Sequence, residues 1–314
     1  MSNDSLQAAA DFTARSLTMV PDKTRYYVAE EEYRAALRAL VPQGIGAEAE
    51  ASLGRRVQAI GLGLFRPDAI AHDRVGPALD YLRRRGLRPF HAQIADVRGP
   101  MVRELWRYQL NAASDERLHL LDLIFEAGSS VLALFHHVVQ PPVPCSVLMA
   151  DVKGPALPSR REGWELRARL RSPSRIEVYF HASDEPADVI REGAIMLGRD
   201  RLAQLLRPYL SETEVAWRDA TDDVLLACKT VGSVPVTPLN DPLLVRTAEE
   251  CGLGSSKNDR WAVLRALAER SPMFRDATRN LIRQTGSREW WEQSPRATER
   301  ASILRSESID DEFA

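Results

Sequence analysis

The stretch RIEVYFHASDEPADVIRE, residues 175–192, changes from strand-like to helix-like sequence within a few residues. Apolar and other side chains alternate over 175–180, which predicts a half-buried strand that ends just before His181. Acidic residues and a proline follow, and they are typical of a helix start. This segment therefore predicts a strand, a short loop containing the histidine, and a helix.

Strand and helix patterns also alternate through residues 57–139. Apolar runs of strand length are separated by segments of helical periodicity, in the order strand, helix, strand, two helices, strand. Residues 140–174 contain several prolines and many arginines with little periodicity, which indicates a long loop region. This order predicts an α+β sandwich, with helices over a mainly antiparallel sheet. The predicted strands are 57–65, 89–97 and 129–139, and the predicted helices are 73–88, 100–110 and 114–128.

The regions on either side of this central part lack its strand patterns. Residues 1–54 are expected to form an N-terminal helical extension, with a flexible start and helices over 29–40 and 46–56. Residues 213–314 are expected to form a helical C-terminal region that ends in an acidic disordered tail, RSESIDDEFA. The domain with the strands is therefore expected to cover residues 55–212.

The composition is that of an ordinary globular protein. The 314 residues carry a net charge of −2, so no overall field selects nucleic acid or an anionic membrane. The three cysteines are far apart and form no metal-binding pair, which fits a reducing compartment. No uninterrupted apolar run approaches the ~20 residues of a membrane span, and the first residues lack a secretory pattern. We expect a cytoplasmic protein without a membrane partner, for which nucleic acid is not the expected ligand.

His181 follows the predicted strand and precedes the predicted helix. Ser183 and Asp184 are suitable N-caps, and the positive end of the helix attracts anions such as phosphate. The same end disfavours imidazolium, so a neutral ring could act as a nucleophile or a base, with Glu192 orienting its other nitrogen. The alternative is a histidine that ends a strand and forms only local hydrogen bonds.

Two other stretches contain glycines that invite comparison with phosphate loops. The GLG stretch at 61–63 lacks the further glycine of a dinucleotide fingerprint and lies in an apolar strand, so close packing is expected there. The CGLGSSKND stretch at 251–259 has the wrong glycine–lysine spacing, so a helix stop followed by a cap is expected.

A second stretch, GLFRPDAIAHDRVGPALDYLRRRGLRPFHAQ at 63–93, resembles the start of nucleoside diphosphate kinases, where a strand ends in a Lys-Pro-Asp-Ala type motif. HASDEPADVIRE is similar to that family's His-Gly-Ser-Asp segment and its trailing helix, and the two stretches occur in the family's order. The resemblance covers residues 57–200. It implies a ferredoxin-like α+β sandwich and transfer of the terminal phosphate of ATP, or another nucleoside triphosphate, through a phosphohistidine, with Mg²⁺.

The resemblance also implies roles for individual residues. His181 would be the phosphorylated nucleophile, Ser183 and Asp184 its local supports, and Glu192 the carboxylate that orients the ring. Two further residues match family positions that bind the nucleotide: Arg167, and Tyr108, with which Trp106 competes.

The chain departs from the family at positions that contact the ligand. Arg66 stands where the family has lysine and Val178 where it has asparagine, and both family residues hold the sugar of the nucleotide. The family's phosphate-binding arginine and threonine are not kept. The candidates to replace their charge are Lys153, Arg160, Arg161, Arg169 and Arg171. For each of these the alternative is an ordinary solvated loop charge.

Two functions follow as expectations. The favoured one is a divergent nucleoside diphosphate kinase-like phosphotransferase that uses His181, with a nucleotide or a specialised metabolite as acceptor, and that forms a homo-oligomer. The alternative is a catalytically degenerate domain that binds a nucleotide or a protein partner. We favour the enzyme because His181, Asp184 and Glu192 occur together.

Overall fold

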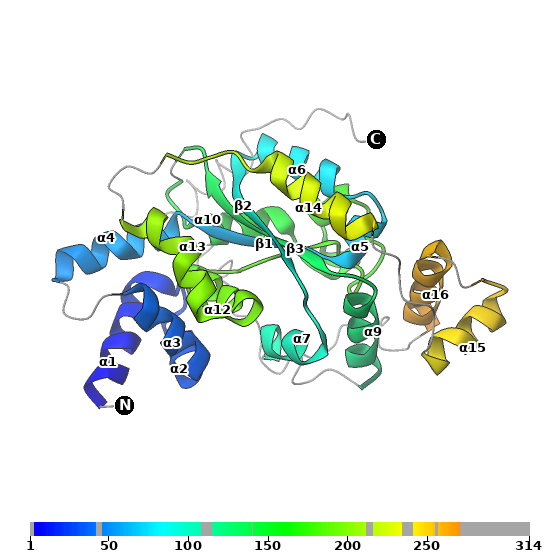
Figure 1. Cartoon of the computed structure of the whole chain (residues 1–314), viewed down its shortest axis with the longest axis horizontal. Helices are drawn as coiled ribbons and strands as arrows, with labels where there is room; N and C mark the ends of the chain where they lie inside the picture. Colours follow the sequence, from blue (N-terminus) through cyan, green and yellow to red (C-terminus); the bar gives the residue numbers. More distant parts are fainter. Residues whose placement is uncertain are drawn as a thin grey trace.

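Four antiparallel strands form the sheet of the computed structural model (Figure 1), in the spatial order β2-β3-β1-β4. The strands are β1 (Gly61–Phe65), β2 (Leu87–Ala95), β3 (Ser130–His137) and β4 (Phe180–Ala182). Helices connect β1 to β2, β2 to β3 and β3 to β4. The spatial order of the strands is that of a ferredoxin-like sheet, and the helices between β2 and β3 are additions to it. The predicted α+β fold is confirmed. The structure describes residues 3–41, 46–107, 115–139, 141–211, 216–233, 241–254 and 257–270.

The α-helices of the described residues fall into three groups along the chain. Before the sheet lie α1 (Asn3–Phe12), α2 (Thr24–Ala29), α3 (Glu31–Leu40) and α4 (Ala47–Gln58). Between the strands lie α5 (Pro67–Ala71), α6 (Val75–Arg84), α7 (Gly99–Leu105), α9 (Asp115–Glu126), α10 (Cys145–Lys153) and α11 (Leu166–Arg169). After β4 come α12 (Pro186–Leu197), α13 (Arg199–Ser211), α14 (Thr221–Ser233), α15 (Pro242–Cys251) and α16 (Lys257–Arg270).

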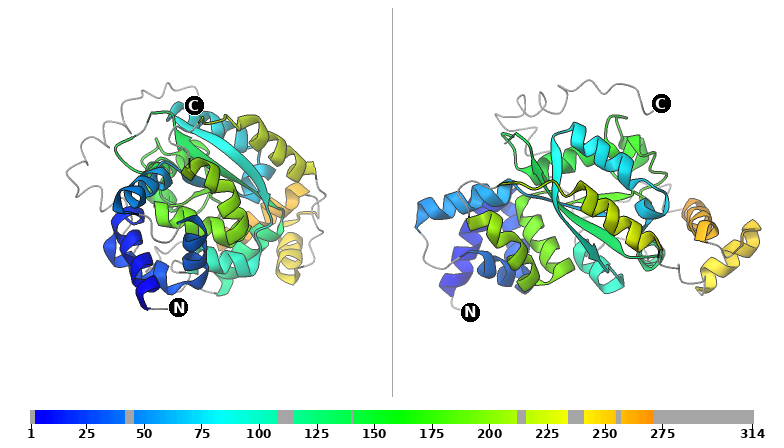
Figure 2. Two further views of the ribbon diagram at one scale, coloured as in Figure 1. Left: turned by 60° about the vertical axis from the view of Figure 1, so that its left-hand side comes forward. Right: turned by 45° about the horizontal axis from the view of Figure 1, so that its top comes forward.

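The sheet separates two apolar clusters because successive side chains of a strand point to opposite faces. In β3, Leu132 and Leu134 belong to the cluster that includes residues of α7, α9 and α12. Val131 and Phe135 belong to the cluster that includes residues of α6, α10 and α14. The sheet is therefore covered on both faces, as Figure 2 also shows.

The helices on either side of the central region pack against it. α3 contacts α12 and α13, and the N-terminal helices lie beside these two in both views of Figure 2. α14 packs on β2 and β3, while α16 contacts α15 and α9. The predicted acidic tail lies outside the described residues. Among the helices of the described ranges, none is both long and apolar enough to cross a membrane.

Several predictions of local structure were wrong. The strand predicted over 57–65 starts only at Gly61, because residues 57 and 58 end α4, and His181, predicted in a loop, lies inside β4. Residues 175–179 are not a strand, because their backbone turns: Tyr179 has φ of +64°, and the Ser174 hydroxyl accepts hydrogen bonds from the backbone N–H groups of residues 176 and 177. Their apolar side chains are buried without strand pairing. The N-terminal residues 3–17 are helical, and the expected loop over 140–174 contains the buried helix α10.

Candidate functional site

His181 occupies the middle of the short strand β4, opposite Leu64 of β1. Its pairing with Leu64 directs it toward the face that carries α7 and α12, and its side chain is 10% exposed. Nε2 of His181 lies 3.0 Å from Oε2 of Glu192, and the Ser183 hydroxyl donates to that same oxygen at 2.6 Å. The structure therefore brings together three of the residues that the sequence singled out.

The carboxylate of Glu192 sets the hydrogen-bonding state of the histidine. Burial opposes ionisation of Glu192, but His181 and the Ser183 hydroxyl outweigh burial and lower its pKa. An ionised carboxylate accepts hydrogen bonds only, so Nε2 must carry the proton that it shares with Glu192. In the neutral ring the lone pair is then on Nδ1, for which the described residues offer no hydrogen-bond partner.

An aromatic side chain contacts the histidine ring from the end of α7. The rings of Trp106 and His181 are 5.2 Å apart between centroids and lie at 90° to each other. The sequence left Tyr108 and Trp106 as alternatives for a place near the nucleophile. Of the two, Trp106 is described and lies against His181, whereas Tyr108 lies outside the described residues.

Lys153 and Asp184 form an ion pair next to His181. Lys153 Nζ donates to Oδ1 of Asp184 at 2.9 Å and to the carbonyl of Ala182 at 2.8 Å. Burial opposes ionisation of Asp184, but Lys153 and Lys23 outweigh burial and lower its pKa to about 2. Asp184 therefore holds a cation beside the loop.

The residue at the N-cap of α12 is Glu185, so the predicted capping by Ser183 or Asp184 was wrong.

Two of the arginines expected to bind the nucleotide donate hydrogen bonds to backbone carbonyls. Arg66 donates to the carbonyl of Ile176 at 2.7 Å, and its Nε lies 3.3 Å from Asp68. Arg167 donates to the carbonyls of Gly154 and of the residue before His181, at 2.8 and 3.1 Å. Burial, with the nearby charges of Arg66 and Arg161, lowers the pKa of Arg167 to about 9. Arg167 therefore supports the backbone of β4, and Arg66 supports the turn that precedes it.

Arg161 organises the loop that follows α10. Its guanidinium donates to four backbone carbonyls, those of Pro155, Ala156, Ser172 and Ser174. These bonds tie the two ends of the loop together, which is a structural use of the charge. Arg160 is exposed in the 3₁₀-helix Pro158–Arg160.

Sequence reasoning missed the contribution of the N-terminal extension. Glu185 is fully buried and accepts hydrogen bonds from Lys23 Nζ, Tyr27 Oη, the Thr18 hydroxyl and the backbone N–H of Met19, at 2.5 to 2.9 Å. The available signal was the density of acids in DEPADVIRE, since buried carboxylates need partners from elsewhere. These contacts hold residues 18–27 against the start of α12. The predicted anion-attracting helix end therefore already has carboxylates and a lysine packed against it.

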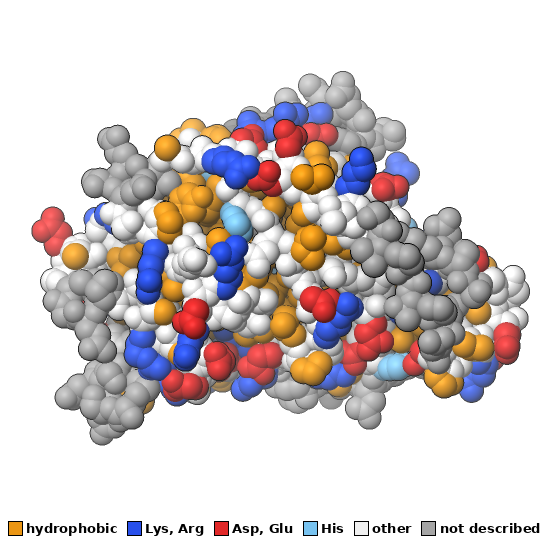
Figure 3. Space-filling model, viewed as in Figure 1, with side chains coloured by type: hydrophobic (Ala, Val, Ile, Leu, Met, Phe, Trp, Pro, Cys, Tyr) orange, Lys and Arg blue, Asp and Glu red, His pale blue; other side chains and the backbone are white. Residues whose placement is uncertain are grey.

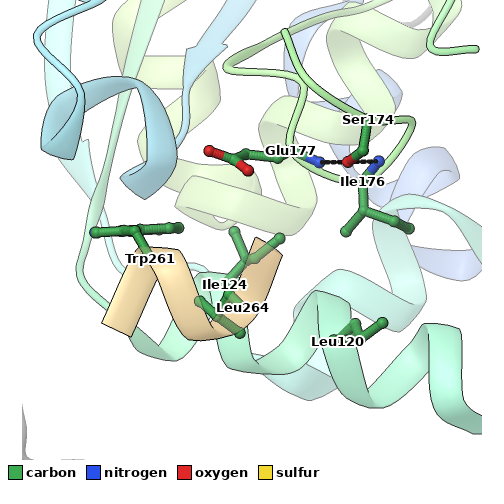
Figure 4. Close-up of a pocket in the computed structure, with 7 residues that line it drawn as sticks. All are labelled: Leu120, Ile124, Ser174, Ile176, Glu177, Trp261 and Leu264. Carbon is green, nitrogen blue, oxygen red and sulfur yellow. Dashed lines mark hydrogen bonds between the residues drawn. The ribbon is translucent and has the colours of Figure 1, made fainter. Parts of the chain in front are cut away.

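A small pocket lies apart from this site, between α9, α16 and the segment before Tyr179 (Figure 4). It is lined by Leu120, Ile124, Ser174, Ile176, Glu177, Trp261 and Leu264. Glu177 is held by His72 at 2.8 Å and by Arg265 at 2.9 Å. The lining of the pocket is mainly apolar, and its one carboxylate, that of Glu177, already has two partners.

The described ranges contain no group of three or more His, Cys, Asp or Glu side chains placed to hold a metal ion. Figure 3 shows both signs of charge interspersed over the visible face of the molecule. No family model matches the sequence, and no curated protein matches it either. The chemistry of this site therefore depends on His181, its hydrogen-bonded neighbours, and the cations that surround them.

Proposed function

We propose that this protein is a nucleoside diphosphate kinase-like phosphotransferase in which His181 carries the phosphate. The observation that supports this most is the hydrogen-bonded chain from Ser183 to Glu192 to His181. A carboxylate that accepts the Nε2 proton keeps the lone pair on Nδ1 and stabilises positive charge on the ring as Nδ1 reacts. A histidine that merely ends a strand does not need this arrangement.

The reaction consists of two displacements at phosphorus. Nδ1 of His181 attacks the terminal phosphorus of a nucleoside triphosphate, the Nδ1–P bond forms, and the bridging P–O bond breaks with its electron pair leaving on the diphosphate. An oxygen of the acceptor then attacks the same phosphorus, and the Nδ1–P bond breaks. Glu192 holds the Nε2 proton throughout, so the ring returns to the same tautomer after each cycle.

Magnesium enters this proposal as the counterion of the triphosphate. The described residues do not form a protein-only metal site, and Asp184 is already paired with Lys153. The chemistry that Mg²⁺ supplies when bound is neutralisation of charge on the phosphate oxygens. The acidic residues of the site are therefore more compatible with Mg²⁺ that binds together with the nucleotide than with Mg²⁺ bound by the protein alone.

The acceptor is expected to differ from an ordinary nucleotide. Arg66 is used by the carbonyl of Ile176 and by Asp68, and the side chain of Val178 is buried and apolar. An apolar valine offers no hydrogen bond to a sugar hydroxyl, and the buried Arg66 directs one of its donors to a backbone carbonyl. We therefore propose a modified nucleotide or a specialised metabolite bearing a nucleophilic oxygen as the acceptor.

The experiment is to incubate the full chain with γ-labelled ATP and Mg²⁺ and to measure acid-labile label on the protein. His181→Ala should abolish labelling, whereas His119→Ala, which changes a histidine on α9, should label like the wild type. The absence of label on the wild type, together with no measurable nucleotide affinity, would exclude the proposal. Light scattering of the same sample tests the proposed homo-oligomer, and fractionation of the source cells tests the proposed cytoplasmic location.

A second candidate is a domain that binds a nucleotide or a protein partner without catalysis. The observation in its favour is that Arg66, Arg161 and Arg167 use guanidinium N–H groups on backbone carbonyls. Fewer donors then remain for phosphate oxygens. This candidate predicts that nucleotide raises the melting temperature of the wild type and of His181→Ala equally, with no labelling of either.

A further inference from the structure

A buried arginine links the two segments that carry the side chains in contact with the His181 ring. Arg191 precedes Glu192 in α12 and is 3% exposed. Its Nη1 donates to the carbonyl of Leu105 at 3.0 Å, and its Nη2 donates to the carbonyl of Glu104 at 2.6 Å. These two carbonyls belong to the last turn of α7, so the guanidinium joins α12 to the end of α7.

The end of α7 matters because Trp106 follows it directly. The Trp106 ring lies perpendicular to the ring of His181, with 5.2 Å between their centroids. Glu192, the residue after Arg191, accepts a hydrogen bond from Nε2 of the same histidine. A displacement of Arg191 would therefore move both the hydrogen-bonding partner and the aromatic neighbour of the reactive ring.

The N-terminal extension supplies the carboxylate that keeps Arg191 in place. Oε2 of Glu30 accepts from Nε of Arg191 at 2.6 Å, and Glu30 is itself buried. Burial opposes the charge of Arg191, but Glu30 outweighs burial and raises the pKa of the guanidinium. A buried guanidinium without its carboxylate is costly, so its position depends on Glu30. Figure 1 shows α3, which begins just after Glu30, beside α12.

We propose that Arg191 and Glu30 are positioning residues for the reactive histidine. Arg191 fixes Glu192 and Trp106 relative to each other, and Glu30 of the N-terminal extension fixes Arg191. The extension is then part of the catalytic unit in addition to its packing role. The kinetic consequence of this inference rests on the proposed function, whereas its consequence for the geometry of the His181 ring does not.

An ion pair that only stabilises the fold would give a different result. Its loss would lower the melting temperature and leave the ring of His181 in its native environment in every molecule that is folded. Loss of a positioning residue changes the ring environment and the rate in the folded fraction. The distinction therefore requires measurements on folded protein well below its melting temperature.

The experiment compares four full-length variants with the wild type. Arg191→Gln removes the charge, Arg191→Lys keeps the charge but has fewer donors, and Glu30→Gln removes the carboxylate. Arg103→Gln is the control, because it breaks an α7–α9 ion pair with Asp122 in which the arginine side chain is 42% exposed. For each variant, near-UV circular dichroism reports folding, and long-range ¹H–¹⁵N NMR reports the tautomer and ring-current shifts of His181.

For Arg191→Gln we expect displaced His181 ring signals and a maximal phosphorylation rate lower by on the order of 10- to 100-fold. The half-saturating triphosphate concentration should change little, since the change affects alignment more than binding. Glu30→Gln should show the same effects more weakly, Arg191→Lys should recover part of the rate, and Arg103→Gln should match the wild type. If Arg191→Gln does not fold, Arg191→Lys and Glu30→Gln provide the test.

Wild-type His181 signals and wild-type rates in the folded variants would overturn the inference. If the wild type itself is not phosphorylated, the proposed function fails, and the NMR comparison alone decides the positioning role. Displaced ring signals would then still support it, and unchanged ring signals would refute it.

Discussion

Ser183 and His181 share a single oxygen of Glu192, with the serine hydroxyl at 2.6 Å and Nε2 of the histidine at 3.0 Å. Two hydrogen bonds donated to one carboxylate oxygen stabilise the ionised form of Glu192, which agrees with its lowered pKa. The arrangement fixes which ring nitrogen carries the proton. It also links β4 to α12, so the strand and the helix hold the histidine between them.

Glu192→Gln should lower the rate of His181 phosphorylation by on the order of 100-fold, since a neutral amide neither enforces the Nε2–H tautomer nor stabilises charge on the ring. The side chain keeps its size, so folding should be retained. The measurement is rapid-quench labelling with γ-labelled ATP. Glu48→Gln, at an exposed position of α4, is the matched control and should keep the wild-type rate. A Glu192→Gln variant as fast as this control would contradict the role given to the carboxylate.

Lys153→Met should lower the free energy of unfolding by about 2–3 kcal/mol at pH 7, because it leaves Asp184 and the carbonyl of Ala182 without their shared donor. The folded-state pKa of Asp184 is depressed to about 2, so the stability gained from its ionised form is present above the usual Asp range. That contribution is lost as the pH falls from about 4 toward 2. The destabilisation by Lys153→Met should therefore be smaller at pH 3.

Urea unfolding at both pH values measures this difference. Lys229→Met, which changes an exposed lysine on α14, serves as the control for loss of a lysine charge. Equal destabilisation by Lys153→Met at pH 7 and pH 3 would show that the Asp184 ion pair is not its cause.

Two of the longer strands were predictable because their signals are local. The strand predicted over 129–139 is β3 at Ser130–His137, and the strand predicted over 89–97 is β2 at Leu87–Ala95. The helix start near DEPAD is also confirmed, since α12 begins at Pro186. In each case the pattern depends on side chains that are neighbours in sequence.

The remaining features depend on contacts between distant segments. Residues 175–179 alternate like a strand, but Asp68 accepts from the backbone N–H of Tyr179 at 3.1 Å and helps hold a turn there. Lys23 lies 162 positions before its partner Glu185, so no local pattern could pair them. Likewise, Arg161 was considered as one of the loop cations that replace a phosphate-binding charge, with a solvated loop charge as the alternative, whereas the folded loop surrounds it with backbone carbonyls. Local sequence predicts elements, but it does not predict which charges the fold uses internally.

Gly63→Ala should lower the free energy of unfolding by about 1–3 kcal/mol, because the sheet has no room for an added methyl group there. A Cβ at this position would lie 2.6 Å from the ring of Phe180 and 2.9 Å from the ring of Phe135. The close packing that the sequence predicted for this glycine is confirmed. Since Phe180 precedes His181, the variant should also displace the His181 ring signals in NMR spectra.

The control for Gly63→Ala is a glycine with open space around it. A Cβ at Gly76, in the first turn of α6, meets nothing within 4 Å, so Gly76→Ala should raise stability by up to about 1 kcal/mol. Thermal unfolding of both variants gives the comparison. Similar effects of the two substitutions would mean that the rings near Gly63 move aside without cost.

Asp188→Asn should stabilise the protein at pH 8 and have little effect near pH 4. Burial, opposed by the charge of Lys23 and reinforced by those of Glu185 and Glu192, raises the pKa of Asp188 to about 8. Between the unfolded pKa of about 4 and the folded value, the native state holds a proton that the unfolded chain has lost. Stability therefore falls as the pH rises through this window.

An asparagine at position 188 removes this penalty and keeps a polar group within hydrogen-bond distance of the Tyr27 hydroxyl, which lies 2.9 Å from Oδ1 of Asp188. The expected gain at pH 8 is about 1–2 kcal/mol, or roughly 2–4 °C in melting temperature for each 1 kcal/mol. Melting curves of the wild type and the variant at pH 4, 6 and 8 measure it. A gain that stays constant over these pH values would show that ionisation of Asp188 does not oppose folding, and a loss at pH 8 would show that its charge is needed beside Lys23.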